Sequence, residues 1–160
     1  MIVFKTGDNL GMSKAKLRAA TVGGSADAIE AQFYEALQTG DLEKLMACWA
    51  DEDEIVCVHP GGPRLVGNAS IRAAFEAMFA NGTIAARPEN IYKVESLTSA
   101  MHNVTERVAL LTTDGTQEAV VVATNVYQRT AQGWRMVAHH ASPGTAASHA
   151  EAHDAPQVLH

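Results

Sequence analysis

The chain has 160 residues, of which 47% are hydrophobic and 19% charged, and twelve Lys and Arg against eighteen Asp and Glu give a net charge of −6. This length suits one domain, for which area scaling predicts that about 69% of the surface of the unfolded chain is buried on folding, enough for a core without disulfides or metal ions. The net negative charge opposes binding to nucleic acid or to an anionic membrane, so neither is expected as a partner.

The start of the chain carries no strong structural signal. Residues 1–24 show no sustained hydrophobic period, so we expect an N-terminal extension that does not define the fold. An export signal and an apolar run of membrane-spanning length are both missing from the sequence. Cys48 and Cys57 lie in apolar stretches without a CxxC pair, which predicts two buried thiols in a reducing compartment. The predicted location is therefore the cytoplasm.

Three amphipathic helices are predicted in the first half of the chain. The first begins after the N-cap Ser25, with apolar residues at helical spacing, and ends at Gly40. Asp41 caps a second helix, whose apolar stripe runs as far as Trp49. A third begins after Gly67 and ends before the Asn-Gly pair at residues 81–82.

Strands are predicted between the second and third helices and again after Pro88. Residues 55–59 form a short β-rich run that ends at Pro60, in a loop of Pro and Gly. Four further strands in a meander are predicted at residues 91–97, 104–112, 118–129 and 134–141. This order predicts an α+β fold with three helices packed on one face of an antiparallel sheet, and it excludes a doubly wound parallel sheet.

The predicted domain therefore covers residues 25–144. Residues 145–160 hold five alanines and three histidines without an apolar period, which predicts a mobile tail rather than a metal-binding segment.

Four segments resemble the nuclear transport factor 2-like superfamily and, within it, the SnoaL-like proteins and the relatives of ketosteroid isomerase. They are residues 33–42 (FYEALQTGDL), 58–60 (VHP), 66–71 (VGNASI) and 133–142 (GWRMVAHHAS). The last segment is most similar to the association (hub) domains of calcium/calmodulin-dependent kinases. The four lie in the family's order and the resemblance covers residues 25–142.

The resemblance implies that the curved sheet and its helices form a cone around an apolar cavity able to hold a small apolar ligand. It also implies self-association through the outer face of the sheet, as a homodimer or a larger assembly. Members of the superfamily include isomerases, dehydratases, cyclases and pure assembly modules, so the fold does not decide the function.

Two departures from the ketosteroid isomerases bear on catalysis. Those enzymes place an aspartate base just before the proline that ends the first strand, where this chain has His59 before Pro60. Their oxyanion-binding tyrosine lies seven residues before the position of Gly40, where this chain has Phe33, which donates no hydrogen bond. Steroid isomerisation by that mechanism is therefore not expected.

The hub domains line their cavity with arginines, and this chain departs from them as well. Alignment on residues 133–134 puts Asn125, Thr112 and Ala141 at three of the arginine positions. The resemblance therefore does not carry the binding of a carboxylate by arginines over to this chain.

Three histidines are candidates for chemistry. His59 shares a strand face with Ile55 and Cys57, and it could act as a base toward a ligand or form only a structural hydrogen bond. His139 and His140 are adjacent, so alternation sends one into the cavity and one to the outer face. The hub resemblance puts a cavity arginine at Ala141, which shares the parity of His139, and therefore implies that His139 points inward, as a polar partner of His59.

The remaining candidates are ligand-binding residues. Phe33, Trp49 and Tyr92 are aromatic side chains that could wall a cavity or pack in the core. Asn125 is a candidate polar partner, and His140 is included with the ligand-binding candidates because it matches a recurrent position of the hub motif. No metal site or cofactor is predicted, since no third ligand is evident near His59.

Two functions remain open from the sequence. The first is a noncatalytic module for ligand binding or assembly, which is favoured because the residues that carry the chemistry of the relatives are replaced. The alternative is an isomerase, dehydratase or cyclase that transfers a proton on an apolar carbonyl compound with His59 as base.

Overall fold

Three helices and six strands make up the part of the chain that the computed structural model describes, residues 24–145 apart from the side chains of residues 111 and 112. In chain order they are α2 (Ala26–Thr39), α3 (Leu42–Met46), β1 (Val56–Val58), β2 (Arg64–Val66), α4 (Asn68–Ala80), β3 (Ala86–Glu95), β4 (Ser99–Thr112), β5 (Gly115–Thr130) and β6 (Gly133–Pro143). The predicted α+β class is confirmed.

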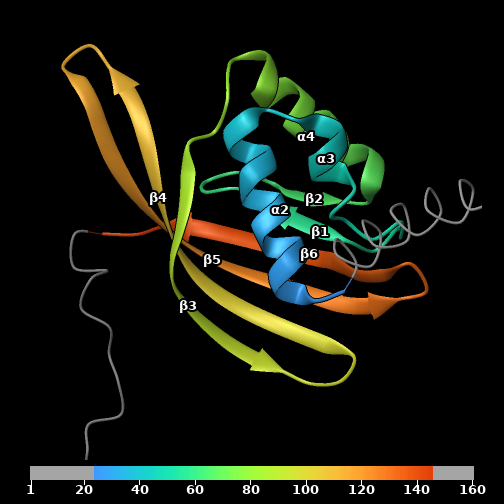
Figure 1. Ribbon diagram of the computed structural model, residues 1–160. Helices are drawn as coiled ribbons and strands as arrows, with labels where there is room; N and C mark the ends of the chain where they lie inside the picture. Colours follow the sequence, from blue (N-terminus) through green and yellow to red (C-terminus); the bar gives the residue numbers. More distant parts are fainter. Residues whose placement is uncertain (1–23, 146–160) are drawn as a thin grey trace, which may run out of the picture.

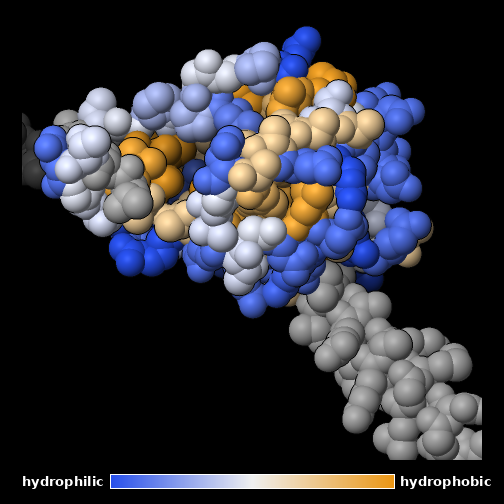
Figure 2. Space-filling view, turned by 90° about the horizontal axis from the view of Figure 1, so that it is seen from above, coloured by the Kyte–Doolittle hydropathy of each residue, from blue (hydrophilic) through white to orange (hydrophobic). Residues whose placement is uncertain are grey.

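The strands form one curved, unclosed sheet in the order β2-β1-β6-β5-β4-β3. The sheet bends around α2, while α3 and α4 lie beside that helix, and β4 and β5 extend together beyond the other strands (Figure 1). Helices and sheet thus form the expected cone-shaped α+β fold. Seen from above, apolar side chains show in hollows between hydrophilic ones (Figure 2).

Two pairings of the sheet differ from the prediction, and β3 and β4 each begin five residues earlier than predicted. The sheet is mixed, because β1 pairs in parallel with β6, with Cys57 opposite His139. In addition, the segment predicted as a loop after Pro60 contains β2, which pairs antiparallel with β1. The sequence near these strands does not indicate either pairing. β1 and β6 are separated in the chain by the other strands and α4, and β2 has only three residues.

Local capping determines where the first two helices begin and end. The Ser25 hydroxyl accepts a hydrogen bond from the Ala28 amide, and α2 stops at Gly40, whose φ of 68° suits glycine. The Asp41 carboxylate caps α3 at the Lys44 amide. This second helix is shorter than predicted, because Trp49 lies beyond it and forms an isolated bridge with Met136.

The core lies between α2 and the concave face of the sheet. Phe33 is fully buried at its centre, where full burial of such a side chain contributes about 1.5–3 kcal/mol. Its ring meets those of Tyr34, Trp49 and Phe75 edge-on, at centroid distances of 5.2, 6.5 and 6.3 Å. The aromatic cluster joins α2 and α4 to the sheet.

The remaining predictions concern the thiols, membrane spans and chain ends. Cys48 and Cys57 are buried free thiols, as predicted, and burial raises the pKa of each to about 12. Among residues 24–145, no helix has the length and apolar character needed to cross a membrane. The predicted N-terminal extension and tail lie outside the described residues, except for Gly24 and Thr145.

Candidate functional site

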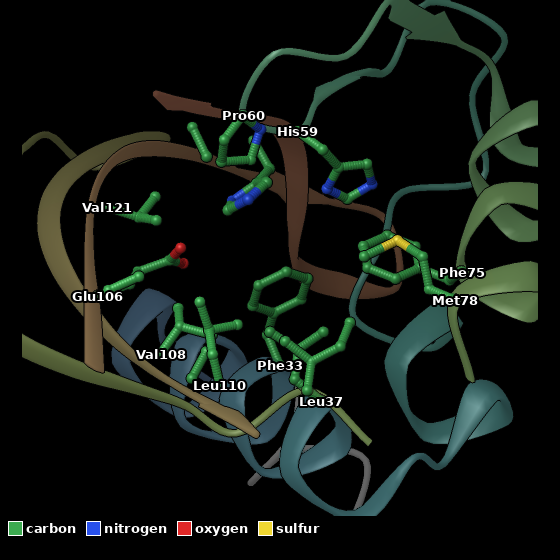
Figure 3. Close-up of a pocket in the computed structure, with 15 residues that line it drawn as sticks. Phe33, Leu37, His59, Pro60, Phe75, Met78, Glu106, Val108, Leu110 and Val121 are labelled. Carbon is green, nitrogen blue, oxygen red and sulfur yellow. The ribbon is translucent and has the colours of Figure 1, made fainter. Parts of the chain in front are cut away.

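A cavity of about 210 Å³ lies between α2, α4 and strands β4 to β6. Most of its wall is apolar, and the polar side chains that reach it are His59, Glu106 and His139. Figure 3 shows the Glu106 carboxyl pointing into the cavity from one side, with His59 and Phe75 across from it. The apolar wall is built mainly by Phe33, Leu37, Phe75, Met78, Val108 and Val121.

His59 stands where β1 ends and the chain turns at Pro60. The turn is closed by the Gly62 amide, which donates to the His59 carbonyl at 2.9 Å. The half-buried imidazole packs edge-on against Phe75, at 5.0 Å between centroids, and its Nε2 lies 3.7 Å from the Cys57 sulfur. Burial lowers the pKa of His59, so the ring is neutral near pH 7 and offers one donor and one acceptor.

His139 lies on β6 beside His59, with 6.2 Å between the ring centroids. Burial, followed by the charges of His59 and His140, lowers the pKa of His139 to about 3, so this ring is also neutral. Its Nδ1 lies 2.6 Å from Oδ1 of Asn125. Because the Asn125 amide nitrogen donates to Tyr34, Oδ1 is the acceptor and His139 Nδ1 carries the proton. Nε2 of His139 is therefore a hydrogen-bond acceptor.

Glu106 is the acidic group of the cavity, and the sequence analysis did not identify it. It projects from β4, is only 5% exposed, and accepts a hydrogen bond from the Tyr34 hydroxyl at 2.7 Å. Burial raises the pKa of Glu106 to about 6; the charge of Glu30 adds to this shift and the hydrogen bond from Tyr34 opposes it. The carboxyl group therefore changes protonation close to neutral pH.

A second buried carboxylate, Glu30 of α2, lies behind the cavity wall. It receives hydrogen bonds from Tyr127 at 2.5 Å, His102 at 2.9 Å and Asn125 at 3.4 Å. Burial lowers the pKa of His102, but its hydrogen bond to Glu30 and the charge of Glu30 outweigh burial and raise the pKa above its ordinary value. Asn125 links this buried carboxylate to Tyr34 and thus to Glu106.

The structure brings together some of the candidate residues and separates others. Phe33, His59 and His139 line the cavity. Asn125 does not line the cavity but lies directly behind His139, where its hydrogen bond orients the His139 ring. Trp49 packs in the core beside Phe33, outside the cavity lining, so its candidate role in ligand binding is corrected to core packing.

Two ligand-binding candidates lie on the outer face of the sheet and are corrected. Tyr92 is 48% exposed and pairs with Asn103, just after the irregularity in β3 that begins at Glu89. His140 is exposed because it neighbours the inward-pointing His139, and side chains alternate along a strand. Neither residue reaches the cavity.

A signal for Glu106 was present in the sequence. Inward residues of β4 alternate, and Glu106 has the same parity as the apolar Val104 and Val108. A carboxyl group at a core-facing position of a strand is unusual unless it is paired or functional. Parity identifies such a position, whereas the cavity and the Tyr34 hydroxyl are visible only in the folded structure.

The family model of the SnoaL-like domain matches residues 27–146. A solved structure from Thiobacillus denitrificans, described as a candidate type II calcium/calmodulin-dependent protein kinase association domain, is 34% identical over 76% of this chain and 96% of that one, with a TM-score of 0.68. A candidate dehydratase of the nuclear transport factor 2-like family from Streptomyces avermitilis is 31% identical over 74% and 93%, with a TM-score of 0.65. No curated protein matches the sequence.

Proposed function

Because the chain belongs to the SnoaL-like domain family, as its four segments predicted, we propose that its cavity binds a small apolar compound and transfers a proton on it. Glu106 is the acid–base group of this proposal, whereas the sequence favoured a noncatalytic module and gave His59 as the base only in the alternative, enzymatic interpretation. The single observation that supports it is a buried carboxyl group in an apolar cavity, with a pKa raised to about 6. A group that titrates near the working pH is well suited to general acid–base catalysis.

The proposed step is removal of a proton from a carbon next to a carbonyl group. The Glu106 carboxylate accepts the proton, the electron pair of the C–H bond forms a carbon–carbon double bond, and the π pair of the carbonyl group moves onto its oxygen to give an enolate. An N–H of neutral His59 hydrogen-bonds that oxygen, and the protonated Glu106 returns the proton to another carbon or to a leaving hydroxyl. Tyr34 engages Oε2 of Glu106, which leaves Oε1 for the ligand.

The reaction class fits both the cavity and the similarity to the candidate dehydratase. Isomerisation and dehydration of a carbonyl compound both begin with loss of a proton next to the carbonyl group, and neither needs a cofactor. Near neutral pH the two neutral imidazoles place no positive charge beside the carboxylate that would lower its pKa.

The cavity volume limits the substrate. An engineered cavity of about 150 Å³ accommodates benzene, so the 210 Å³ found here suits one ring with a short substituent. We therefore expect a monocyclic or short branched carbonyl compound.

The test uses small cyclic ketones and enones, such as cyclohexanone and cyclohex-3-enone, in deuterated buffer. Proton NMR should show loss of the α-proton signals at a rate that depends on protein concentration and saturates with ketone. Binding of the same compounds is followed through the ring resonances of His59. Compounds that bind without any exchange above the buffer rate would contradict catalysis and leave a binding module.

We predict no steroid isomerase activity comparable to that of the true isomerases. Phe33 supplies no oxyanion donor, and a fused four-ring substrate exceeds a cavity suited to one ring. Ultraviolet absorption of the conjugated enone formed from an unconjugated steroid enone measures the activity. Rapid turnover that His59→Ala abolishes would contradict this prediction.

We also propose that the chain is a homodimer or larger through the outer face of the sheet. Val94 and Met101 are 67% and 38% exposed on this face, next to the half-buried Val126. Covering such a patch removes apolar surface from water.

Light scattering at micromolar concentration should give at least twice the monomer mass. Val126→Lys should lower this mass and Ala131→Lys, in the exposed β5–β6 turn, should not; a monomeric parent chain would contradict the proposal.

A further inference from the structure

Three metal-ligating side chains meet at the N-terminal end of α2, outside the cavity. They are Asp27 of α2, Glu95 at the end of β3 and His102 of β4, and their ligand atoms all lie within 4.8 Å of one another. His102 Nε2 is 3.3 Å from Glu95 Oε1 and 3.8 Å from Asp27 Oδ1. The carboxylates are more than half exposed, whereas the imidazole is fully buried.

The buried imidazole is oriented by a third carboxylate, Glu30, which lies behind it. Nδ1 of His102 lies 2.9 Å from Glu30 Oε2, and Glu30 is itself buried. Both ring nitrogens face carboxylates, so without a metal ion Nε2 donates its proton to Glu95. A metal ion would replace the Nε2 proton and take up the lone pair directed at Glu95 and Asp27, while the proton on Nδ1 stays hydrogen-bonded to Glu30. The same arrangement of carboxylate, imidazole and metal recurs around protein-bound zinc, where the outer carboxylate sets the tautomer and raises ligand basicity.

We propose that Asp27, Glu95 and His102 bind a divalent transition-metal ion, with zinc as the best fit. Ligand bonds of about 2.0–2.1 Å in a tetrahedron place neighbouring ligand atoms about 3.3–3.5 Å apart. The distances from His102 Nε2 to the two carboxylate oxygens, 3.3 and 3.8 Å, are close to this ligand–ligand distance before any movement of the exposed carboxylates. One imidazole with two carboxylates favours zinc over magnesium or calcium, which prefer oxygen ligands alone.

The site has room for a fourth ligand. A hollow of about 130 Å³ adjoins it and is lined by Asp27, Glu95, Ser25 and Ser96 among others. Three protein ligands and an accessible fourth position are typical of zinc sites that bind water or a small anion.

Lys93 makes the proposal sharply testable. Its ammonium group lies 2.7 Å from Asp27 Oδ1, so a positive charge already stands where the metal would bind. A metal ion must displace this side chain, which is 37% exposed and free to swing into solvent. Removing the charge should therefore strengthen metal binding, whereas a purely structural ion pair predicts no such gain.

The experiment is a titration of the full-length chain with Zn²⁺ by calorimetry and with Co²⁺ by visible absorption. His149, His153 and His160 are first replaced by glutamine, so that the histidine-containing tail does not bind the metal. We expect one ion per chain and the intense ligand-field bands of four- or five-coordinate Co²⁺. Asp27→Asn and Glu95→Gln should each weaken Zn²⁺ binding at least about tenfold, and Lys93→Gln should tighten it.

The matched control is Glu52→Gln, which removes an exposed carboxylate elsewhere and should leave the affinity unchanged. Circular dichroism verifies that each variant is folded, as expected for substitutions at exposed positions. Absence of binding, or equal affinity in the parent, Asp27→Asn and Glu95→Gln chains, would overturn the proposal. The result is independent of the proton transfer proposed for the cavity.

Discussion

Glu106→Gln is expected to lower the rate of α-proton exchange by about 10²- to 10⁴-fold, the contribution typical of a positioned general base. Glutamine has nearly the same shape and keeps an oxygen that accepts the Tyr34 hydrogen bond, but it cannot take up a proton at neutral pH. The measurement is the initial rate of deuterium incorporation into the small ketone that binds best.

The pH dependence of the same rate provides a second check on Glu106. The base must be ionised, so kcat/KM should rise with pH up to about 6, the raised pKa of Glu106, and level off above it. If His59 were the base, its lowered pKa would place the rise below the ordinary range of a histidine, and His59→Gln would abolish the rate. Exchange that survives Glu106→Gln unchanged would contradict the proposed role.

The Glu106→Gln variant should remain folded, which makes the rate interpretable. The pKa of Glu106 is raised from 4.5 to about 6 on folding, so the associated stability is present below pH 4.5 and lost as the pH rises through 6. A neutral glutamine avoids this loss, which amounts to about 2 kcal/mol above pH 6. Urea unfolding at pH 7.5 should therefore show a variant at least as stable as the parent, with Glu52→Gln as the unaffected control.

Glu30→Ala is expected to lower the free energy of unfolding by about 3–5 kcal/mol, the usual cost of removing one partner from a buried ion pair. Glu30 is 4% exposed and is the shared acceptor for Tyr127, His102 and Asn125. The substitution leaves these donors without their acceptor in the core, where all three residues are fully buried.

For a chain of this size the loss corresponds to a decrease in Tm of about 6–20 °C. Glu35→Ala is the matched control, because Glu35 lies on the same helix, is exposed and forms a surface ion pair with Lys44. That change should cost no more than about 1 kcal/mol. Equal melting temperatures for the Glu30→Ala and Glu35→Ala chains would show that the buried network does not stabilise the fold.

Helix limits and strand faces were predictable from the sequence because they depend on near neighbours. Ser25 and Asp41 cap helices through amides three residues away, and Gly40 ends α2 through its own backbone conformation. Alternation along β6 placed His139 and His140 on opposite faces by the same local rule. The resemblance of four segments to the family added the prediction that the sheet curves around a cavity.

The chemistry of the cavity was decided by the tertiary structure alone. Tyr34 and Glu106 are 72 residues apart in the chain, and Glu30 and Tyr127 are 97 apart, yet each pair shares a hydrogen bond in the core. The pKa of a carboxyl group depends on the water excluded from it and the charges around it, and folding sets both. The sequence alone therefore placed His59 at the end of its strand, whereas the choice of Glu106 over His59 as the proposed base required the packed structure.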